Sequence, residues 1–209
     1  IVAVKGCTPL AVFVDAVPPA NRDLWIVEAQ VERSATHEPE RGRMICFTPG
    51  TQLRAGEGSI DVAALQPGEL VQTKDNGLQK VLWTGQRRIS GARLHVMPEL
   101  APVRLQAGAL GTGRPDAELL VSPEHRMLVQ GAAARDLVNG RSIWIDRMLR
   151  GVTYVHVLFE RHESVFANGL ETESFHPAQA ALTAGQMAEV EEAIPGATHK
   201  AFARRVLSR

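Results

Sequence analysis

The two cysteines of the chain, Cys7 and Cys46, are the residues whose chemistry needs explaining first. Two cysteines do not make a disulfide framework, and without a CxxC pair they do not indicate a metal site. A lone cysteine is by default a small buried apolar side chain, and we keep this interpretation for Cys7. Cys46 differs, because it follows a charged run, "HEPERGR", and precedes the turn Pro49-Gly50. This position makes Cys46 a candidate nucleophile.

Histidine is a suitable acid or base beside a thiol, because its pKa lies near neutrality. His125 stands three residues after Ser122 in "SPEHRMLV", and His156 and His162 lie in "YVHVLFERHESVFANG". By residue type alone, each could instead be a hydrogen-bonded core residue. The three histidines would bind zinc only if they converged, and their spacing is not a metal signature. The remaining histidines lie in no motif that we connect with function: His37, His95, His176 and His199.

The composition argues against several classes of function. Lys and Arg number 23 and so do Asp and Glu, which gives zero formal net charge. Nonspecific nucleic-acid binding needs a basic field, so we expect no nucleic-acid partner. No apolar run is long enough to span a membrane. The apolar N-terminus is interrupted by Lys5 and Asp15 and does not resemble a signal peptide. Nothing in the sequence indicates a small-molecule cofactor.

Short apolar runs punctuated by Gly, Pro, Asn and Asp predict an all-β domain from about residue 45 to about residue 178. One hairpin is expected around Gly56-Glu57-Gly58. A stronger one is expected around Asp75-Asn76-Gly77, because Asn-Gly tolerates the positive φ values of a tight turn. Residues 152–174 predict another hairpin, with Glu160-Arg161 near its tip. Further strands are predicted in 102–110, 118–131 and 142–148.

Both ends of the chain differ from this domain. Residues 1–45 are interpreted as a leader, made of a β-hairpin around "PPANRD" and a polar linker. In the tail, residues 179–209, Thr183 and Gln186 have the spacing of a capping box, and Pro195-Gly196 ends the predicted helix. Three apolar residues would share one face of that helix: Met187, Val190 and Ile194.

Four motifs, in the right order, resemble the Hint family, the shared module of Hedgehog autoprocessing domains and inteins. They are "CFTPGT", "LQPGELV", "SPEH" and "YVHVLFERHESVFANG". Glu69 stands where the second motif usually has Asp, and Ser122 replaces the Thr of the third. The resemblance covers roughly residues 45–178 and is greatest to bacterial Hint domains found outside true inteins. It implies a horseshoe-like β fold, with the Hint domain at 46–178 between the leader and the helical tail.

The resemblance also implies a reaction. Cys46 matches the family's nucleophile, which attacks the preceding carbonyl, here that of Ile45, and converts the amide into a thioester. Because an amide is more stable than a thioester, the site must stabilise the oxyanion and protonate the departing nitrogen. The family match assigns this protonation to His125, and Ser122 would hold the amide. The leader would be the substrate in cis, with water or an amine as the acceptor.

Two further histidines are candidates for the same site. His156 lies near the position where many inteins carry a polar catalytic group. His162 follows close to the tip of the expected hairpin.

The departures from the family pattern limit the reaction. Splicing needs a terminal His-Asn pair, but Glu173 and Ser174 occupy those positions. No residue there can cyclise, so full splicing is not expected. Sterol transfer needs an added sterol-recognition region, and the tail has little continuous apolar surface. What remains is self-cleavage at Ile45–Cys46, or ligation of the leader to another molecule. Because this is a single turnover in cis, the word enzyme applies only loosely.

Two alternatives stay open. The chain could be a degenerate Hint module that acts as a structural or protein-binding β domain. The β-branched side chain of Ile45 hinders attack at its carbonyl, in keeping with that alternative. A cysteine hydrolase acting in trans would need a substrate cleft beside Cys46. The residues leave localisation undecided, although bacterial members of the family often accompany secreted proteins, which favours secretion.

Overall fold

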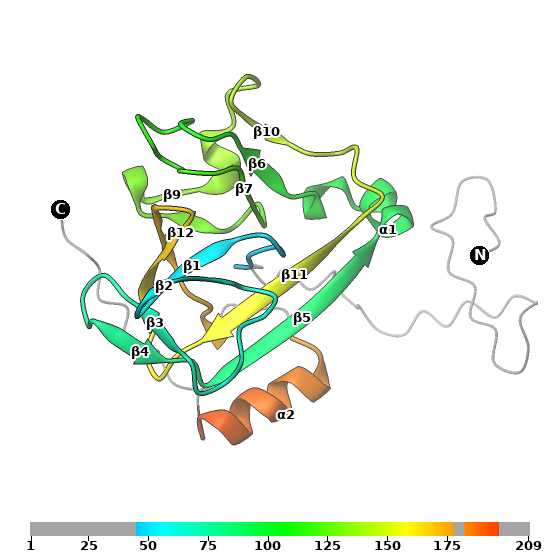
Figure 1. Cartoon of the computed structure of the whole chain (residues 1–209). Helices are drawn as coiled ribbons and strands as arrows, with labels where there is room; N and C mark the ends of the chain where they lie inside the picture. Colours follow the sequence, from blue (N-terminus) through cyan, green and yellow to red (C-terminus); the bar gives the residue numbers. More distant parts are fainter. Residues whose placement is uncertain (1–44, 178–181, 197–209) are drawn as a thin grey trace, which may run out of the picture. The chain divides into compact units, whose positions relative to one another are not determined.

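The computed structural model describes residues 45–177 and 182–196 (Figure 1). The hairpin expected in the leader falls within residues 1–44, outside the described part. Across the described ranges the chain is mostly β, with a short helix near the C-terminus, as the sequence predicts. None of the helices in these ranges has the length and apolar character to span a membrane.

The largest sheet has eight strands, in the order β4-β3-β1-β12-β13-β8-β9, with β2 added beside β1. Neighbouring strands in it pair antiparallel. Its strands come from the beginning, the middle and the end of the domain: β1 (Gln52–Ala55), β2 (Gly58–Asp61), β3 (Leu70–Gln72), β4 (Leu78–Lys80), β8 (Arg126–Met127), β9 (Ala132–Ala133), β12 (Ser164–Ala167) and β13 (Leu170–Glu173).

Two smaller sheets complete the β structure. The long strands β5 (Trp83–Ser90) and β11 (Gly151–Leu158) pair along their whole length, and β6 (Val103–Leu105) lies between β7 (Leu119–Val121) and β10 (Ile143–Ile145). The helices are short: α1 (Gly91–Val96), three 3-10 turns at Pro98–Leu100, Val129–Gly131 and Ala134–Leu137, and α2 (Ala184–Ala193).

The two hairpins predicted around glycine turns are present. β1 and β2 are joined at Gly56-Glu57, and β3 and β4 are joined through Asn76-Gly77, where Gly77 has a φ of 65°. These turns are local, so the residues that need positive φ identify them in the sequence.

The hairpin predicted over residues 152–174 is wrong. β11 pairs with β5, from Gly151 opposite Ser90 to Leu158 opposite Trp83, while β12 pairs with β13 and β1. The tight turn lies instead at Asn168-Gly169, where both φ angles are positive (44° and 73°). β5 offers β11 an eight-residue ladder, which a short hairpin across Glu160-Arg161 would not provide.

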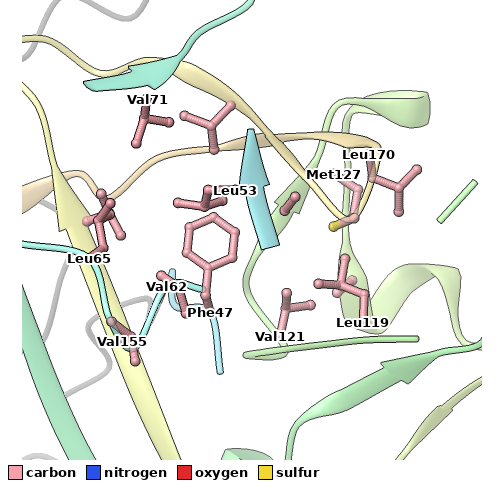
Figure 2. Packing of buried hydrophobic residues seen from close by; sticks show 14 of the residues in the cluster. Phe47, Leu53, Val62, Leu65, Val71, Leu119, Val121, Met127, Val155 and Leu170 are labelled. Carbon is pink, nitrogen blue, oxygen red and sulfur yellow. The ribbon is translucent and has the colours of Figure 1, made fainter. Parts of the chain in front are cut away.

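The main core surrounds Phe47. Its backbone exchanges hydrogen bonds with Val155 in both directions (3.0 and 2.9 Å) and bridges Val121 as well. Figure 2 shows the Phe47 ring among Leu53 and Val62. The segment that contains Cys46 is therefore inserted between β7 and β11, and burial of the Phe47 side chain anchors it there.

The capping box predicted for α2 is confirmed. Thr183 Oγ1 accepts from the Gln186 N–H, and the Gln186 side chain accepts from the Thr183 N–H. The predicted apolar face is only partly correct: Val190 is buried and Ile194 packs beside it, but Met187 is 45% exposed. The Gln186 side chain reaches the Gln86 carbonyl of β5 (3.4 Å). The contact stripe therefore runs through Gln186, Val190 and Ala193, and Met187 lies to one side of it.

Candidate functional site

Cys46 is completely buried at the entry to the domain. Its side chain packs in a small apolar cluster formed by Ile89 of β5, Leu94 of α1, Ala101, and Val152 and Tyr154 of β11. The preceding residue, Ile45, is also buried. The bond that joins these two residues is therefore shielded from bulk water.

His156 is the imidazole next to the thiol. Its Nδ1 lies 3.3 Å from Cys46 Sγ, and its Nε2 lies 3.7 Å from the same atom. In β11, Val155 and Val157 face the main core. Because side chains alternate along a strand, Tyr154 and His156 point to the opposite side, toward Cys46. The ring also makes a hydrogen bond to the Ile45 backbone. His156 thus contacts both sides of the Ile45–Cys46 bond.

Ser122 and His125 hold the peptide groups of Cys46. The Cys46 N–H donates to Ser122 Oγ (2.9 Å), and the Ser122 N–H donates to the Cys46 carbonyl oxygen (3.0 Å). His125 Nδ1 lies 3.1 Å from that same oxygen. The turn after β7, closed by the His125 N–H donating to the Ser122 carbonyl (3.0 Å), aims both side chains at Cys46.

His125 contacts the Cys46 carbonyl oxygen rather than the Cys46 nitrogen. Its ring packs against Phe47 with 4.6 Å between centroids. A neutral imidazole that donates from Nδ1 has an acceptor at Nε2. That Nε2 is buried and has no hydrogen-bond partner among the described residues.

Burial dominates the electrostatics of the site. It raises the pKa of the Cys46 thiol far above its ordinary range, although the hydrogen bond from Ser122 and the positive charge of Arg87 oppose this. Burial lowers the pKa of His125 to about 3, against a hydrogen bond to the Cys46 backbone. It lowers the pKa of His156 to about 4, against the hydrogen bond to Ile45. At neutral pH, Cys46 and His156 therefore form an uncharged thiol–imidazole pair.

His162 makes its contacts elsewhere. Its Nε2 lies 3.1 Å from the Ser174 carbonyl oxygen and 3.7 Å from the Glu173 carboxylate, and its ring stands edge-on to His176. The only imidazole within hydrogen-bond distance of Cys46 Sγ in the described part of the chain is that of His156. Of the five predicted site residues, the structure thus brings together Cys46, Ser122, His125 and His156.

The residues that depart from the family pattern have structural partners. Glu69 accepts from the Gln66 N–H (2.6 Å) and closes its own Pro-Gly turn. Ser174, at the position of the cyclising Asn, is buried and accepts from the Glu163 N–H (2.9 Å). Within residues 45–177 and 182–196, no group of three His, Cys, Asp or Glu side chains is arranged to hold a metal ion.

The sequence analysis missed Arg87 and Tyr154. Arg87 lies opposite Tyr154 in the β5–β11 pair, and its charge acts on both Cys46 and His156. Burial, followed by the nearby Cys46, raises the pKa of Tyr154, whose hydroxyl donates to the Leu100 carbonyl (2.7 Å). The strand-like run "WTGQRRIS" contains Arg87 and could have indicated that Arg87 lies in a strand. Only the pairing of β5 with β11 shows that this strand lies next to the site.

The fold and site together define a β domain whose first strand-like segment carries a buried cysteine beside an imidazole. The chain belongs to the Hint domain family, whose profile matches residues 45–179. The family predicted from the four motifs is confirmed, and the mostly β architecture of the described residues agrees with it.

Several solved structures are similar to this chain. A bacterial intein-like domain from Clostridium thermocellum is 11% identical, with 63% of this chain and 99% of that one covered and a TM-score of 0.39. The MchDnaB-1 intein is 11% identical, with 62% and 99% covered and a TM-score of 0.41. The gp41-1 intein is 17% identical, with 61% and 96% covered and a TM-score of 0.32. A search of curated proteins finds no significant match.

Proposed function

We propose that the domain cleaves its own chain at the Ile45–Cys46 bond through a thioester. Cys46 Sγ attacks the Ile45 carbonyl carbon and forms a C–S bond, and the bond from that carbon to the Cys46 nitrogen breaks. The thiol proton is lost and the departing nitrogen gains one, so the rearrangement is balanced. Residues 1–45 are then carried as an acyl group on Cys46.

The observation that carries this proposal is the position of His156. An uncharged thiol is a weak nucleophile and needs a base to accept its proton as the C–S bond forms. His156 Nδ1 is 3.3 Å from Cys46 Sγ and is neutral at physiological pH. Its hydrogen bond to the Ile45 backbone keeps the same ring beside the carbonyl that is attacked. His156 thus serves as the base for the thiol.

Ser122 and His125 act on the leaving side of the bond. Ser122 Oγ, 2.9 Å from the Cys46 nitrogen, holds the amide that departs. His125 delivers the proton to this nitrogen, as in the family. Because its pKa of about 3 keeps the resting ring neutral, His125 takes up at Nε2 the proton that His156 removed from the thiol and gives up the one on Nδ1, so both rings end neutral. To do so, the His125 ring turns from the Cys46 carbonyl oxygen to the Cys46 nitrogen, one peptide group away. His162 contributes indirectly, by fixing the segment after β13 through Ser174.

Resolution of the thioester requires an external nucleophile. Water attacks the thioester carbonyl, the C–S bond breaks, and the products are a new carboxylate on Ile45 and the free thiol of Cys46. An amine in place of water forms an amide with the leader. Splicing is not part of the proposal, because Ser174 has no side-chain amide that could cyclise.

The experiment is an intact-mass measurement of the purified full chain with and without dithiothreitol or hydroxylamine. Cleavage yields pieces of 45 and 164 residues, about 5 and 18 kDa of the 22.7 kDa chain, in proportion to length. Thiol-dependent appearance of both pieces is expected. Cys46→Ala should abolish it and Cys7→Ala should not. A chain that stays at full mass under every condition contradicts the proposal.

One observation favours a second candidate, a Hint module without chemistry that serves as a structural or protein-binding domain. Cys46 and Ile45 are both buried, and the thiol pKa is raised, which disfavours the thiolate. The full-mass outcome above would support this candidate. Complete burial of Cys46 also weighs against a hydrolase acting in trans, whose substrate would have to reach the sulfur. Such an enzyme would turn over a test thioester, and we expect none.

A further inference from the structure

Two aromatic side chains pack against the His156 ring. The Phe175 ring lies 4.4 Å from the imidazole, between centroids, and the Trp83 indole lies 6.1 Å from it in a stacked orientation, with 20° between the planes. Trp83 and Phe175 also contact each other at 5.8 Å. Together they keep water from the imidazole and restrict the orientations that it can take.

Gly85 provides the space for this arrangement. Gly85 lies opposite His156 in the β5–β11 pair. A Cβ atom at Gly85 would lie 2.0 Å from Cη2 of the Trp83 indole, far inside any van der Waals contact. The Trp83 indole therefore lies over Gly85 of its own strand, and it can do so because Gly85 has no side chain. The indole then lies beside the imidazole.

Helix α2 holds the other edge of the indole. Trp83 Nε1–H donates to the Glu189 carboxylate of α2 (2.8 Å). Val190 of α2 and Leu182 are buried in one cluster with Trp83, Leu158 and Phe175. Figure 1 shows α2 alongside β5, and the Gln186 side chain bonds to that strand. The matched Hint region ends at residue 179, so α2, at Ala184–Ala193, lies beyond it.

We propose that α2 completes the site: acting through Trp83 and Phe175, it fixes His156 beside Cys46 Sγ and keeps water from its ring. This inference rests on the proposed function, in which His156 is the base. Trp83 and Glu189 are positioning residues, since neither contacts the reacting atoms. The titratable groups around His156 are Cys46, Arg87 in β5, Tyr154 in β11 and Glu189 in α2.

The test is a nuclear magnetic resonance titration of His156 in the full chain carrying Cys46→Ala, which cannot form the thioester. Val190→Gln should loosen α2 without adding a charge. We expect faster hydrogen exchange between the Trp83 indole N–H and water, together with a rise of the His156 pKa from about 4 toward 6.5. A rise of about one pH unit or more, a tenfold change in proton affinity, is the expected size. Met187→Gln, at an exposed site of the same helix, should change neither quantity.

A second set of variants tests the link through Glu189. Glu189→Ala removes the indole's acceptor and a negative charge. Loss of the charge alone would lower the His156 pKa, whereas hydration of the ring would raise it. A rise of the His156 pKa in Glu189→Ala therefore supports the inference, and a fall contradicts it. Glu189→Gln keeps an acceptor but lacks the charge, so its His156 pKa should lie slightly below the parent value and not above it. Glu192→Ala, on the exposed side of α2, is the matched control and should leave the pKa unchanged.

The possible outcomes test this inference separately from the proposed function. If Val190→Gln speeds hydrogen exchange of the Trp83 indole N–H but leaves the His156 pKa unchanged, the inference is overturned. It is also overturned if Val190→Gln changes neither the exchange rate nor the pKa. If Val190→Gln does not fold, the sign of the Glu189→Ala shift decides in the same way. If the chain with Cys46 never cleaves but the titration shifts as expected, the proposed function fails and the positioning of His156 by α2 stands.

Discussion

At the scale of single residues, the pair formed by Cys46 and His156 is uncharged because both groups are buried. A thiolate–imidazolium pair would place two charges in an apolar cluster, at a cost that exceeds the mutual attraction of the ions in many buried pairs. Proton transfer from the thiol must therefore accompany bond formation. This makes the distance between Sγ and Nδ1, and not the amount of thiolate present, the quantity that governs the rate.

Replacing His156 should slow the release of the leader. His156→Gln keeps a hydrogen-bonding side chain of similar size but removes the base. Positioned general bases contribute about 10²- to 10⁴-fold, and we expect a loss of that order in the first-order cleavage rate with dithiothreitol. The exposed His95→Gln is the control and should cleave at the parent rate. A His156→Gln chain that cleaves as fast as the parent would assign the base elsewhere.

At the scale of elements, the turn between β12 and β13 joins three parts of the domain. Asn168, with a φ of 44°, accepts from the N–H of Gln52, the first residue of β1 (2.7 Å), and donates to the Glu118 carbonyl before β7 (2.8 Å). Its own carbonyl accepts from the Asp116 N–H (2.9 Å). The turn therefore ties the large sheet to the β6–β7 sheet, and Ser122 directly follows β7.

Asn168→Ala should destabilise the domain by about 3 kcal/mol. This figure sums about 1 kcal/mol for each of two lost hydrogen bonds and about 1 kcal/mol for a left-handed conformation without Asn. Asn168→Asp keeps the acceptor for the Gln52 N–H and the tolerance of positive φ, so we expect a smaller loss. Urea unfolding followed by circular dichroism measures both. A loss below about 1 kcal/mol for the Ala variant would mean that the turn is not a structural link.

At the scale of the whole molecule, two of the buried histidines, His125 and His156, couple stability to pH. Both folded pKa values, about 3 for His125 and about 4 for His156, lie below the ordinary value of 6.5. Between these values the unfolded chain binds protons that the folded chain does not bind. Their contribution to stability is therefore complete above pH 6.5 and is lost as the pH falls. Glu163, whose pKa is raised mainly by burial, acts in the opposite direction.

The free energy of unfolding should therefore fall on acidification from pH 6.5 toward pH 4. Each histidine adds a slope of up to about 1.4 kcal/mol per pH unit in that window. Replacing His125 or His156 by Gln removes one titrating group, so each variant should show a shallower dependence, measured by urea unfolding at several pH values. An unchanged slope in both variants would mean that neither ring is buried in its neutral form.

Patterns among neighbouring residues are enough to identify the Hint family, the hairpins at Gly56-Glu57 and Asn76-Gly77, and the capping box at Thr183. The hairpins and the capping box depend on backbone requirements within about four residues, which the residue types reveal directly, and the family is identified by short motifs and their order. The pairing of β11 with β5 was mispredicted, because nothing local distinguishes a partner across a turn from one some sixty residues earlier.

The chemistry of the site depends on contacts between distant parts of the chain. Cys46 and His156 are 110 positions apart, and Cys46 and Ser122 are 76 apart. The motifs named both histidines of "YVHVLFERHE" as candidates, but only the β11–β5 ladder turns His156 toward the thiol, and it leaves His162 in the loop before β12, where it contacts Ser174. A residue's type states what chemistry it can do, whereas strand register and burial decide which groups meet and in which protonation state.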